Sequence, residues 1–267
     1  MASIFGVERA LIGVIHLQAL PGTPLAAAAL AETVARAVDE AALFQQAGFH
    51  GVVIENMHDR PYLRRSVGPE VVASMTAAAC SVRREVSLPI GIQVLAGANR
   101  EALAVALASG AAFVRVEGFV FGHLADEGLI EADAAELLRY RRSIGAEQIR
   151  IFADIKKKHA AHALTADLDV VETARAAEFF LADGVIVTGT ATGRPADPAD
   201  VESVCASVAI PTLVGSGVTP ENVGLFGRAD GLIVGSSLKL DGHWSNPVDH
   251  DRLTAMVRAF GALATGA

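Results

Sequence analysis

The chain has 267 residues, 52% of them hydrophobic, and a formal net charge of −8 at pH 7. This composition excludes a disordered chain and disfavours a nucleic-acid partner, which normally requires a basic surface. Residues 10–31 are uncharged but are interrupted by Pro21, Gly22 and Pro24, so we expect no membrane insertion. The acidic charge, together with residues 1–6, which lack a basic region followed by an apolar one, favours a cytoplasmic protein.

Eight apolar strand segments, each followed by a helical segment, are predicted along the chain. The strands are expected at residues 11–17, 51–55, 90–94, 113–117, 149–155, 185–188, 212–214 and 232–234. The helices are expected at about 27–47, 69–86, 99–109, 131–144, 168–181, 198–208, 220–226 and 249–263. The strands are continuous apolar runs, which is typical of strands buried on both faces of a parallel sheet.

The number of these units favours a single (β/α)8 TIM-barrel domain that covers residues 1–267. Turns from helix to strand, such as Ala47-Gly48 and Ser109-Gly110, are short, whereas the loops from strand to helix are long and polar. Long βα loops collect on one face of a barrel, which is the face that holds active sites. A doubly wound open sheet is the alternative, because it has the same alternation of strands and helices.

Polar side chains end almost every predicted strand, and Asp154 and Lys156 are the principal catalytic candidates among them. A lysine beside carboxylates in a dry barrel mouth can act in proton transfer or form a Schiff base. If the strand continues, alternation places Asp154, Lys156 and Lys158 on one side and Lys157 on the other. A structural ion pair at the barrel rim is the alternative for Asp154 and Lys156, and Lys157 and Lys158 could form a solvated basic patch.

Glu55, Glu117 and His16 complete the catalytic candidates, because each lies at a predicted strand end. The two glutamates could act as acid or base, and together with Asp154 they could bind Mg²⁺, which prefers oxygen ligands. Each glutamate could instead form a structural ion pair. The candidate partners for such pairs are Arg115, Arg64 and Lys156. The histidines and cysteines show no spacing typical of a zinc site.

Two glycine-rich turns follow the last two predicted strands, at residues 215–220 and 235–237. In a (β/α)8 barrel the loops after strands 7 and 8 hold a phosphate, with backbone N–H groups aimed at the anion. The predicted phosphate-binding residues are therefore Gly215, Ser216, Gly217, Gly235 and Ser236. A third polar turn, which runs from Thr188 and Gly189 to Gly193, could extend this cradle. The alternative is that these are ordinary tight turns that need glycine for their backbone conformation.

Several motifs resemble those of the BtpA/SgcQ family. They are Gly13-Val14-Ile15-His16-Leu17-Gln18-Ala19-Leu20-Pro21-Gly22, Ile54-Glu55-Asn56, Arg115-Val116-Glu117-Gly118, Ala153-Asp154-Ile155-Lys156-Lys157-Lys158-His159 and 183–193. The similarity covers about Leu11 to Phe260 and implies a TIM-like barrel. The family takes its name from a role in photosystem I biogenesis in cyanobacteria, and some relatives lie beside sugar-phosphotransferase genes. The resemblance supplies no catalytic residues.

Two functions of different kinds follow from these observations. The first is an enzyme that acts on a small phosphorylated metabolite such as a sugar phosphate, by aldol cleavage, isomerisation or epimerisation. The second is a non-catalytic biogenesis or stability factor for a membrane complex such as photosystem I. The ionisable strand ends favour the enzyme, since a scaffold does not need them at one barrel mouth. The sequence leaves open whether the chain forms a homo-oligomer.

Overall fold

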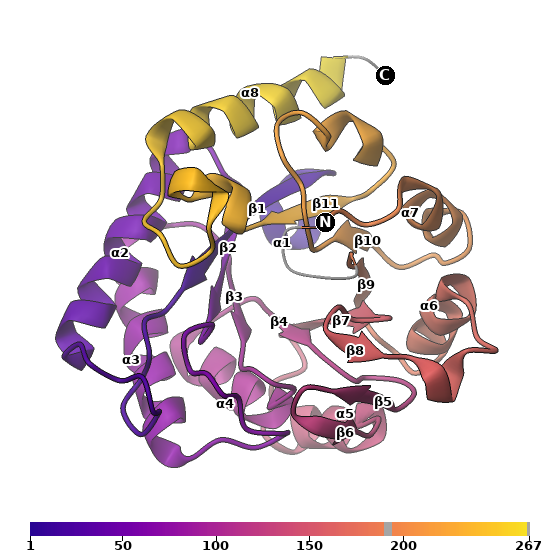
Figure 1. Cartoon of the computed structure of the whole chain (residues 1–267), viewed down its shortest axis with the longest axis horizontal. Coiled ribbons are helices and arrows are strands. Elements are labelled where there is room, and N and C mark those ends of the chain that lie inside the picture. The colour runs from indigo at the N-terminus through magenta and orange to yellow at the C-terminus, as the bar shows by residue number, and fades with distance from the viewer. Residues whose placement is uncertain (190–193, 266–267) are drawn as a thin grey trace.

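A closed barrel of eight parallel strands forms the centre of the molecule in the computed structural model, which describes residues 1–189 and 194–265 (Figure 1). The barrel strands are β1 (Ala10–His16), β2 (Gly51–Glu55), β3 (Ile90–Gln93), β4 (Phe113–Val116), β7 (Arg150–Ile155), β9 (Gly184–Val187), β10 (Thr212–Val214) and β11 (Gly231–Val234). β1 pairs with β11 and so closes the ring. The (β/α)8 barrel predicted from the sequence is confirmed, and the open doubly wound sheet is excluded.

Helices surround this barrel. They are α2 (Leu30–Ala47), α3 (Pro69–Glu85), α4 (Asn99–Ser109), α5 (Ala134–Ser143), α6 (Val170–Phe179), α7 (Pro198–Cys205) and α8 (His250–Thr265). Between β10 and β11 the chain forms the short 3-10 helix η2 (Val223–Phe226) in the region where a helix was expected. The remaining 3-10 segments are η1 (Ala163–Thr165), η3 (Ser236–Leu238) and η4 (Leu240–Gly242).

Local sequence signals set several of the helix ends. α2 ends at Gly48, whose φ of 95° is a left-handed conformation that suits glycine. α3 begins at Pro69, whose ring already has the φ of a first helical turn. α6 begins with a capping box, in which the Glu172 N–H donates to the Asp169 carboxylate at 2.7 Å and the Asp169 N–H donates back to Glu172 at 3.1 Å.

Two features were not predicted from the sequence. The first is the N-terminal helix α1 (Ala2–Phe5). The second is a small antiparallel sheet, which we call the side sheet, formed within the loops that follow β4 and β7 (Figure 1). It consists of β5 (His123–Ala125), β6 (Gly128–Ile130) and β8 (Ala160–Ala161). These strands are too short to produce a readable alternation of polar and apolar residues.

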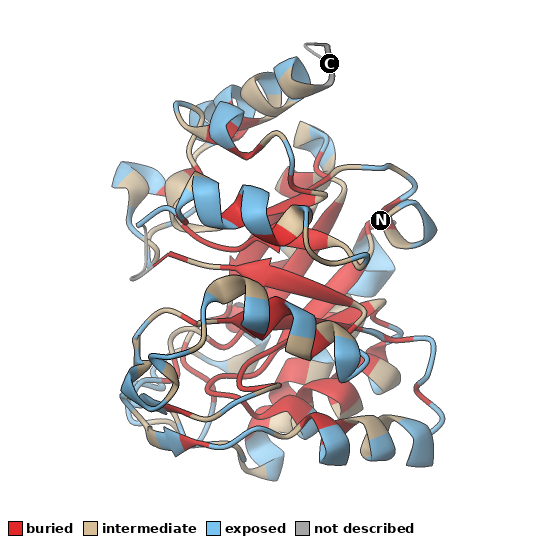
Figure 2. Cartoon of the chain, turned by 90° about the vertical axis from the view of Figure 1, so that its right-hand side faces the viewer, coloured by how far each residue is buried: buried red, intermediate tan, exposed pale blue. Residues whose placement is uncertain are grey.

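The core has two parts, one inside the barrel and one between the strands and the surrounding helices. Figure 2 shows the buried strands in the interior and helices whose outer faces are exposed. Inside the barrel, the ring of Phe113 lies 5.5 Å from Phe5 and 5.4 Å from Phe152. Gly91 makes room for them, because a Cβ there would lie 2.2 Å from the Phe113 ring. Aromatic rings thus fill this part of the barrel, while polar groups gather at the C-terminal ends of the strands.

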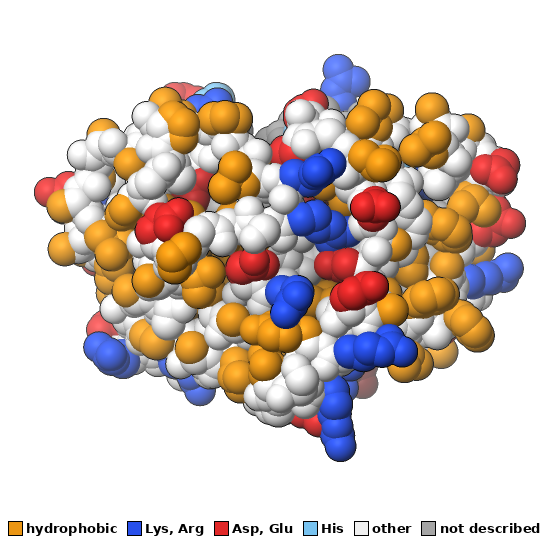
Figure 3. All heavy atoms as spheres, turned by 90° about the horizontal axis from the view of Figure 1, so that it is seen from below, with side chains coloured by type: hydrophobic (Ala, Val, Ile, Leu, Met, Phe, Trp, Pro, Cys, Tyr) orange, Lys and Arg blue, Asp and Glu red, His pale blue; other side chains and the backbone are white. Residues whose placement is uncertain are grey.

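The surface carries charges of both signs. Figure 3 shows basic and acidic side chains interspersed with hydrophobic ones on the face that is the lower edge of Figure 1. Leu124 and Leu129, which pair across β5 and β6, are among the exposed hydrophobic residues at 51% and 44% exposure. Within residues 1–189 and 194–265, no helix is both long enough and apolar enough to span a bilayer.

Candidate functional site

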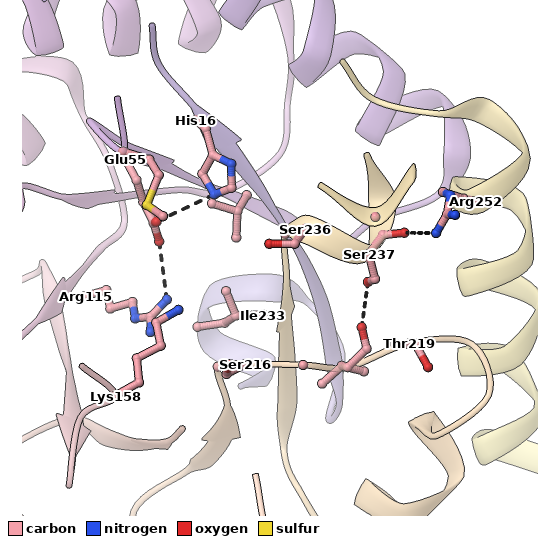
Figure 4. Close-up of a pocket in the computed structure, with 17 residues that line it drawn as sticks. His16, Glu55, Arg115, Lys158, Ser216, Thr219, Ile233, Ser236, Ser237 and Arg252 are labelled. Carbon is pink, nitrogen blue, oxygen red and sulfur yellow. Dashed lines mark hydrogen bonds and ion pairs between the residues drawn. The ribbon is translucent and has the colours of Figure 1, made fainter. Parts of the chain in front are cut away.

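A cavity of about 200 Å³ lies at the C-terminal ends of the barrel strands (Figure 4). Two groups of residues line it from different sides. We call the first the charged wall; it consists of the side chains His16, Glu55, Arg115 and Lys158. We call the second the turn wall; it consists of residues 215–219 and 235–237, which follow β10 and β11. The cavity therefore lies on the barrel face that holds active sites in this fold.

Arg115 organises the charged wall from its position on β4. Its Nε donates to Asp154 Oδ1 at 2.9 Å and its Nη2 donates to Asp154 Oδ2 at 3.0 Å. Its Nη1 lies 3.3 Å from Glu55 Oε1. Burial lowers the pKa of the guanidinium, but the charges of Asp154 and Glu55 outweigh this and raise it. Arg115 is therefore a fixed cation that holds two carboxyl groups in place.

His16 is neutral and presents an acceptor toward Glu55. Its Nδ1 lies 2.9 Å from the Trp244 carbonyl oxygen, which can only accept, so Nδ1 carries the hydrogen. Burial, followed by the nearby charge of Lys239, lowers the pKa of His16 to about 3. Nε2 is therefore unprotonated near neutral pH, and it lies 3.9 Å from Glu55 Oε2.

Glu55 is the carboxyl group that lines the cavity, and it binds a proton more tightly than an ordinary glutamate does. Burial raises the pKa of Glu55, and the opposing charge of Arg115 does not cancel that effect. A carboxyl group with a raised pKa exchanges a proton more readily near neutral pH than an ordinary one. Because Oε1 lies toward Arg115 and Oε2 toward His16, the group is oriented as well as activated.

Glu117 lies outside the cavity, behind the charged wall. Its Oε2 accepts from Lys157 Nζ at 3.0 Å, and its Oε1 accepts from Gln93 Nε2 at 3.3 Å. Burial raises the pKa of Glu117, but the charge and hydrogen bond of Lys157 prevail and lower it. The structural ion pair that was considered for this glutamate is thus present, although its partner is Lys157.

The three consecutive lysines after β7 point to three different places. The strand ends at Ile155, and Lys156 has a φ of 47°, so the alternation expected to continue through Lys158 stops there. Lys156 Nζ donates to the Thr165 carbonyl oxygen at 2.8 Å, outside the cavity. Lys157 pairs with Glu117, whereas Lys158 reaches the cavity. Asp154 and Lys156 are therefore not brought together in the cavity.

The turn wall needs its glycines for close packing. A Cβ on Gly215 would lie 2.5 Å from Ile186 Cγ2 and 3.2 Å from Arg115 Nη2. A Cβ on Gly217 would lie 2.2 Å from the Pro195 nitrogen, and its φ of 64° is left-handed. Ser216 Oγ also donates to the Arg194 carbonyl oxygen at 3.0 Å. The segment 194–195 and the turn after β10 therefore fit together without room for a side chain.

The two turns are joined to each other and to α8. Ser237 Oγ donates to the Val218 carbonyl oxygen at 2.6 Å, and Arg252 Nη1 lies 3.3 Å from the Ser237 carbonyl oxygen. Among the described residues, the backbone N–H groups of Gly217, Ser236 and Ser237 donate to no protein acceptor. All three residues line the cavity, so the turn wall offers donors to a ligand, which is the usual way in which such turns bind an anion.

Thr188 and Gly189, from the third predicted turn, do not line the cavity. Thr188 Oγ1 accepts a hydrogen bond from the backbone N–H of Lys158 at 3.2 Å and so fixes the backbone from which the Lys158 side chain extends. A Cβ on Gly189 would lie 2.1 Å from the Arg194 carbonyl oxygen. The last part of this predicted turn, residues 190–193, lies outside the described residues.

The cavity residues that were not selected as site residues from the sequence include Arg115, Lys158, Ser237 and Arg252. Arg115 was recognised only as an ion-pair partner, although its spacing from Glu117 already predicted an inward side chain. Ser237 directly follows a predicted phosphate residue and could have been included. Arg252 enters from α8, far along the chain from the other cavity residues, and no local pattern indicates it.

The carboxylates in and behind the cavity form ion pairs with positively charged side chains of the protein. Glu55 and Asp154 face Arg115, and Glu117 faces Lys157. Across residues 1–189 and 194–265, no three or more His, Cys, Asp or Glu side chains are grouped so that they could hold a metal ion. The described residues therefore do not form the Mg²⁺ site that was considered from the three carboxylates.

A closed (β/α)8 barrel with a polar cavity at the C-terminal ends of its strands defines the structural class of the protein. The model of the BtpA family matches residues 7–262, and the chain belongs to this family. It is 44% identical to an uncharacterised mitochondrial protein of Caenorhabditis elegans, over 98% of this chain and 97% of the worm protein. It is 37% identical to the photosystem I biogenesis protein BtpA of Synechocystis, over 96% and 89% of the two chains.

Solved structures with the same fold include enzymes that are named after phosphorylated compounds. The geranylgeranylglyceryl phosphate synthase of Thermoplasma acidophilum, in complex with sn-glycerol-1-phosphate, is 15% identical with a TM-score of 0.62, over 97% and 96% of the two chains. The phosphoribosyl anthranilate isomerase of Thermus thermophilus is 13% identical with a TM-score of 0.58, over 95% of this chain and 99% of the isomerase. At these identities the likeness establishes the fold alone.

Proposed function

We propose that the protein is an enzyme that binds a small phosphorylated metabolite, such as a sugar phosphate, and transfers a proton on it. The observation that carries this proposal is that the turn wall and the charged wall line the same cavity. The turn wall offers amide donors for an anion, and the charged wall contains an oriented carboxyl group with a raised pKa. Isomerisation, epimerisation and aldol cleavage all require such a proton transfer.

The phosphate would lie on the turn wall. Gly215, Ser216, Gly217, Gly235 and Ser236 all line the cavity, and they follow the seventh and eighth barrel strands, where this fold usually binds phosphate. The solved structures of the same fold support this assignment by analogy, since one holds sn-glycerol-1-phosphate. Thr188 and Gly189 would act indirectly, through Lys158 and through the segment 194–195.

Glu55 would be the group that transfers the proton. Its raised pKa brings it closer to the operating range of a general acid–base catalyst than an ordinary glutamate. Neutral His16 would accept a hydrogen bond from the substrate or from protonated Glu55 through Nε2. A pKa of about 3 makes His16 itself a weak base at neutral pH. Asp154 would act by holding Arg115, and Glu117 by holding Lys157, while Lys156 has no assigned contact with the ligand.

Calorimetric titration with inorganic phosphate and with sn-glycerol 1-phosphate tests the proposed binding site. We expect Ser236→Asp to weaken both interactions at least about tenfold, because a carboxylate would then face the phosphate. Ser203→Asp is the matched control, since Ser203 is exposed on α7. Equal affinities of wild type and Ser236→Asp would contradict the phosphate site.

A non-catalytic role in the biogenesis of a membrane complex is the second candidate, and the name of the Synechocystis relative supports it. Complementation of a Synechocystis strain that lacks this relative separates the two candidates. If the role is catalytic, only the wild-type chain complements, whereas Glu55→Gln does not. If the role is non-catalytic, both chains complement equally.

Other expectations from the sequence stay predictions. These are a single domain over residues 1–267, the absence of a nucleic-acid partner and the cytoplasmic location. The C. elegans relative is named as mitochondrial.

A further inference from the structure

Lysine is scarce in this chain, and three of its four copies are consecutive residues after β7. The sequence contains four lysines among 22 Lys and Arg residues: Lys156, Lys157, Lys158 and Lys239. Arginine thus supplies most of the positive charge. Arginine stays protonated in proteins, whereas a buried lysine can lose its proton and become a nucleophile. A position that requires a neutral amine can therefore be occupied by lysine but not by arginine.

Lys158 differs from the other three lysines in its contacts. Lys156 Nζ donates to the Thr165 carbonyl oxygen, Lys157 Nζ to Glu117 and Lys239 Nζ to Glu40. Lys158 Nζ makes no hydrogen bond or ion pair with any residue in 1–189 or 194–265. The neighbouring carboxylates of Glu55 and Asp154 face Arg115 instead. The amine of Lys158 therefore reaches the cavity without a fixed partner.

The surroundings of Lys158 favour its neutral form. Burial, followed by the positive charge of Arg115, lowers the pKa of the Lys158 ammonium. Its backbone is fixed, because its N–H donates to Thr188 Oγ1 at 3.2 Å. Figure 4 shows Lys158 beside Arg115, on the side of the cavity away from Thr219 and Ser237. A ligand whose phosphate lies on the turn wall would thus extend toward this amine.

We infer that Lys158 forms a Schiff base with the carbonyl carbon of a phosphorylated aldehyde or ketone bound in the cavity. This inference rests on the proposed function and narrows it, because the substrate class becomes a phosphorylated carbonyl compound. It assigns to Lys158 the nucleophilic role that the sequence suggested for Lys156. The geometric reason for this choice is that Lys158 Nζ lines the cavity and forms no ion pair with a carboxylate of the described residues, although Glu55 and Asp154 are close enough to act on its charge.

Groups that line the cavity can supply the nucleophile and the proton that formation of the Schiff base requires. The neutral Nζ attacks the carbonyl carbon, the C–N bond forms, and one nitrogen proton moves to the carbonyl oxygen to give a carbinolamine. Protonated Glu55 then donates its proton to the hydroxyl group, the C–O bond breaks, and water leaves. The products are a protonated imine and ionised Glu55, which can next accept a proton from the carbon adjacent to the imine. Hydrolysis by water reverses the linkage and releases the amine.

Reductive trapping of the full-length protein tests the inference. The probes are dihydroxyacetone phosphate and glyceraldehyde 3-phosphate with sodium cyanoborohydride, and the readout is intact mass followed by peptide mapping. We expect one adduct per chain, at Lys158, with at least one of the two probes. Lys158→Arg should reduce the adduct at least about tenfold, since arginine keeps the charge but is not a nucleophile. Lys156→Arg is the matched control and should still be trapped.

Calorimetry with inorganic phosphate on the same proteins separates this inference from the proposed function. Phosphate binding without an adduct from either probe would overturn the Schiff base and leave the phosphate site standing. An adduct only on Lys156, Lys157, Lys239 or the N-terminal amine would also overturn it. Absence of phosphate binding would remove the proposed function itself. An adduct at Lys158 in a wild type that binds phosphate, lost in Lys158→Arg with phosphate binding retained, is the supporting result.

Discussion

The two walls of the cavity are built in different ways. The charged wall brings together side chains from β1, β2, β4 and the loop after β7, and Arg115 links its carboxyl group, Glu55, to Asp154 outside the cavity. The turn wall comes from two neighbouring strands and offers mainly backbone groups, with glycines where no side chain fits. Recognition on one wall therefore depends on local backbone conformation, whereas the chemistry on the other depends on charges that meet only in the folded barrel.

This difference means that the two walls can be damaged separately. A change to the charged wall should alter proton transfer or global stability while the amides of the turn wall remain in place. A change to the turn wall should alter phosphate affinity while the pKa shifts of Glu55 and His16 remain. The following predictions use this separation.

Removal of Arg115 should have the largest effect. Arg115→Ala leaves the carboxylates of Asp154 and Glu55 buried without their cation, and loss of one partner of a buried pair costs about 3–5 kcal/mol. Urea unfolding of the purified variant measures this loss. Arg142→Ala, which removes an exposed ion pair with Glu147, is the control and should leave the unfolding midpoint nearly unchanged. Similar midpoints for the two variants would show that the charged wall is not held by Arg115.

Glu55→Gln should come next, with an effect on rate. Glutamine can still accept a hydrogen bond from Arg115, but it cannot exchange a proton, so proton transfer should fall about 100-fold or more. Deuterium uptake from D₂O into dihydroxyacetone phosphate and related sugar phosphates, followed by NMR, measures the exchange. Glu221→Gln, at an exposed position, should exchange at the wild-type rate. Undiminished exchange in Glu55→Gln would remove Glu55 from the proposed mechanism.

Gly217→Ala should damage the turn wall. The new Cβ would lie 2.2 Å from the Pro195 nitrogen at a left-handed φ of 64°, which should destabilise the protein by about 1–3 kcal/mol. Calorimetry should also show at least about tenfold weaker binding of inorganic phosphate. Gly224→Ala is the matched control, because a Cβ there would meet nothing within 4 Å. A Gly217→Ala variant with wild-type stability and affinity would contradict this description of the turn.

The pH dependence of stability should show a smaller effect at His123, which lies behind the charged wall beside Lys157. Burial, followed by the charge of Lys157, lowers the pKa of His123 from 6.5 to about 4. Between these values the unfolded chain binds the proton and the folded chain does not, so stability falls as the pH decreases from 7 to 5. His123→Gln should reduce that fall by an amount on the order of 1 kcal/mol.

Urea unfolding at pH 7 and pH 5 measures the contribution of His123. His250→Gln, at an exposed position on α8, serves as the control and should retain the wild-type difference between the two pH values. If His123→Gln and the wild type lose equal stability on acidification, the histidine is not held neutral by its surroundings.

The sequence predicts the barrel and the turn wall well because both leave local signals. Each barrel strand is a continuous apolar run, and glycines mark the turns after β10 and β11 by their spacing alone. Where backbone conformation and burial follow from neighbouring residues, as at Gly48 or Gly217, a single sequence is informative. The seventh helix was predicted near its observed place, although only the 3-10 helix η2 forms there.

The charged wall was predicted only in part, because its geometry depends on the backbone beyond β7. Strand alternation groups Lys156 with Asp154, but Lys156 adopts a left-handed φ of 47° and the alternation ends. Lys157 then turns to Glu117, and Lys158 becomes the cavity lysine. Arg252 joins the cavity from α8, and its partner Ser237 lies 15 residues earlier in the chain. Such contacts are set by tertiary packing and leave no local pattern.

A crystal structure of the protein soaked with dihydroxyacetone phosphate tests the central claim most directly. We predict that the phosphate lies against the turn wall, with its oxygens accepting hydrogen bonds from the N–H groups of Gly217 and Ser236, and that the carbonyl end points toward Glu55 and Lys158. A phosphate bound at the charged wall instead, or no ligand in the cavity at a concentration that saturates binding in solution, would contradict the account.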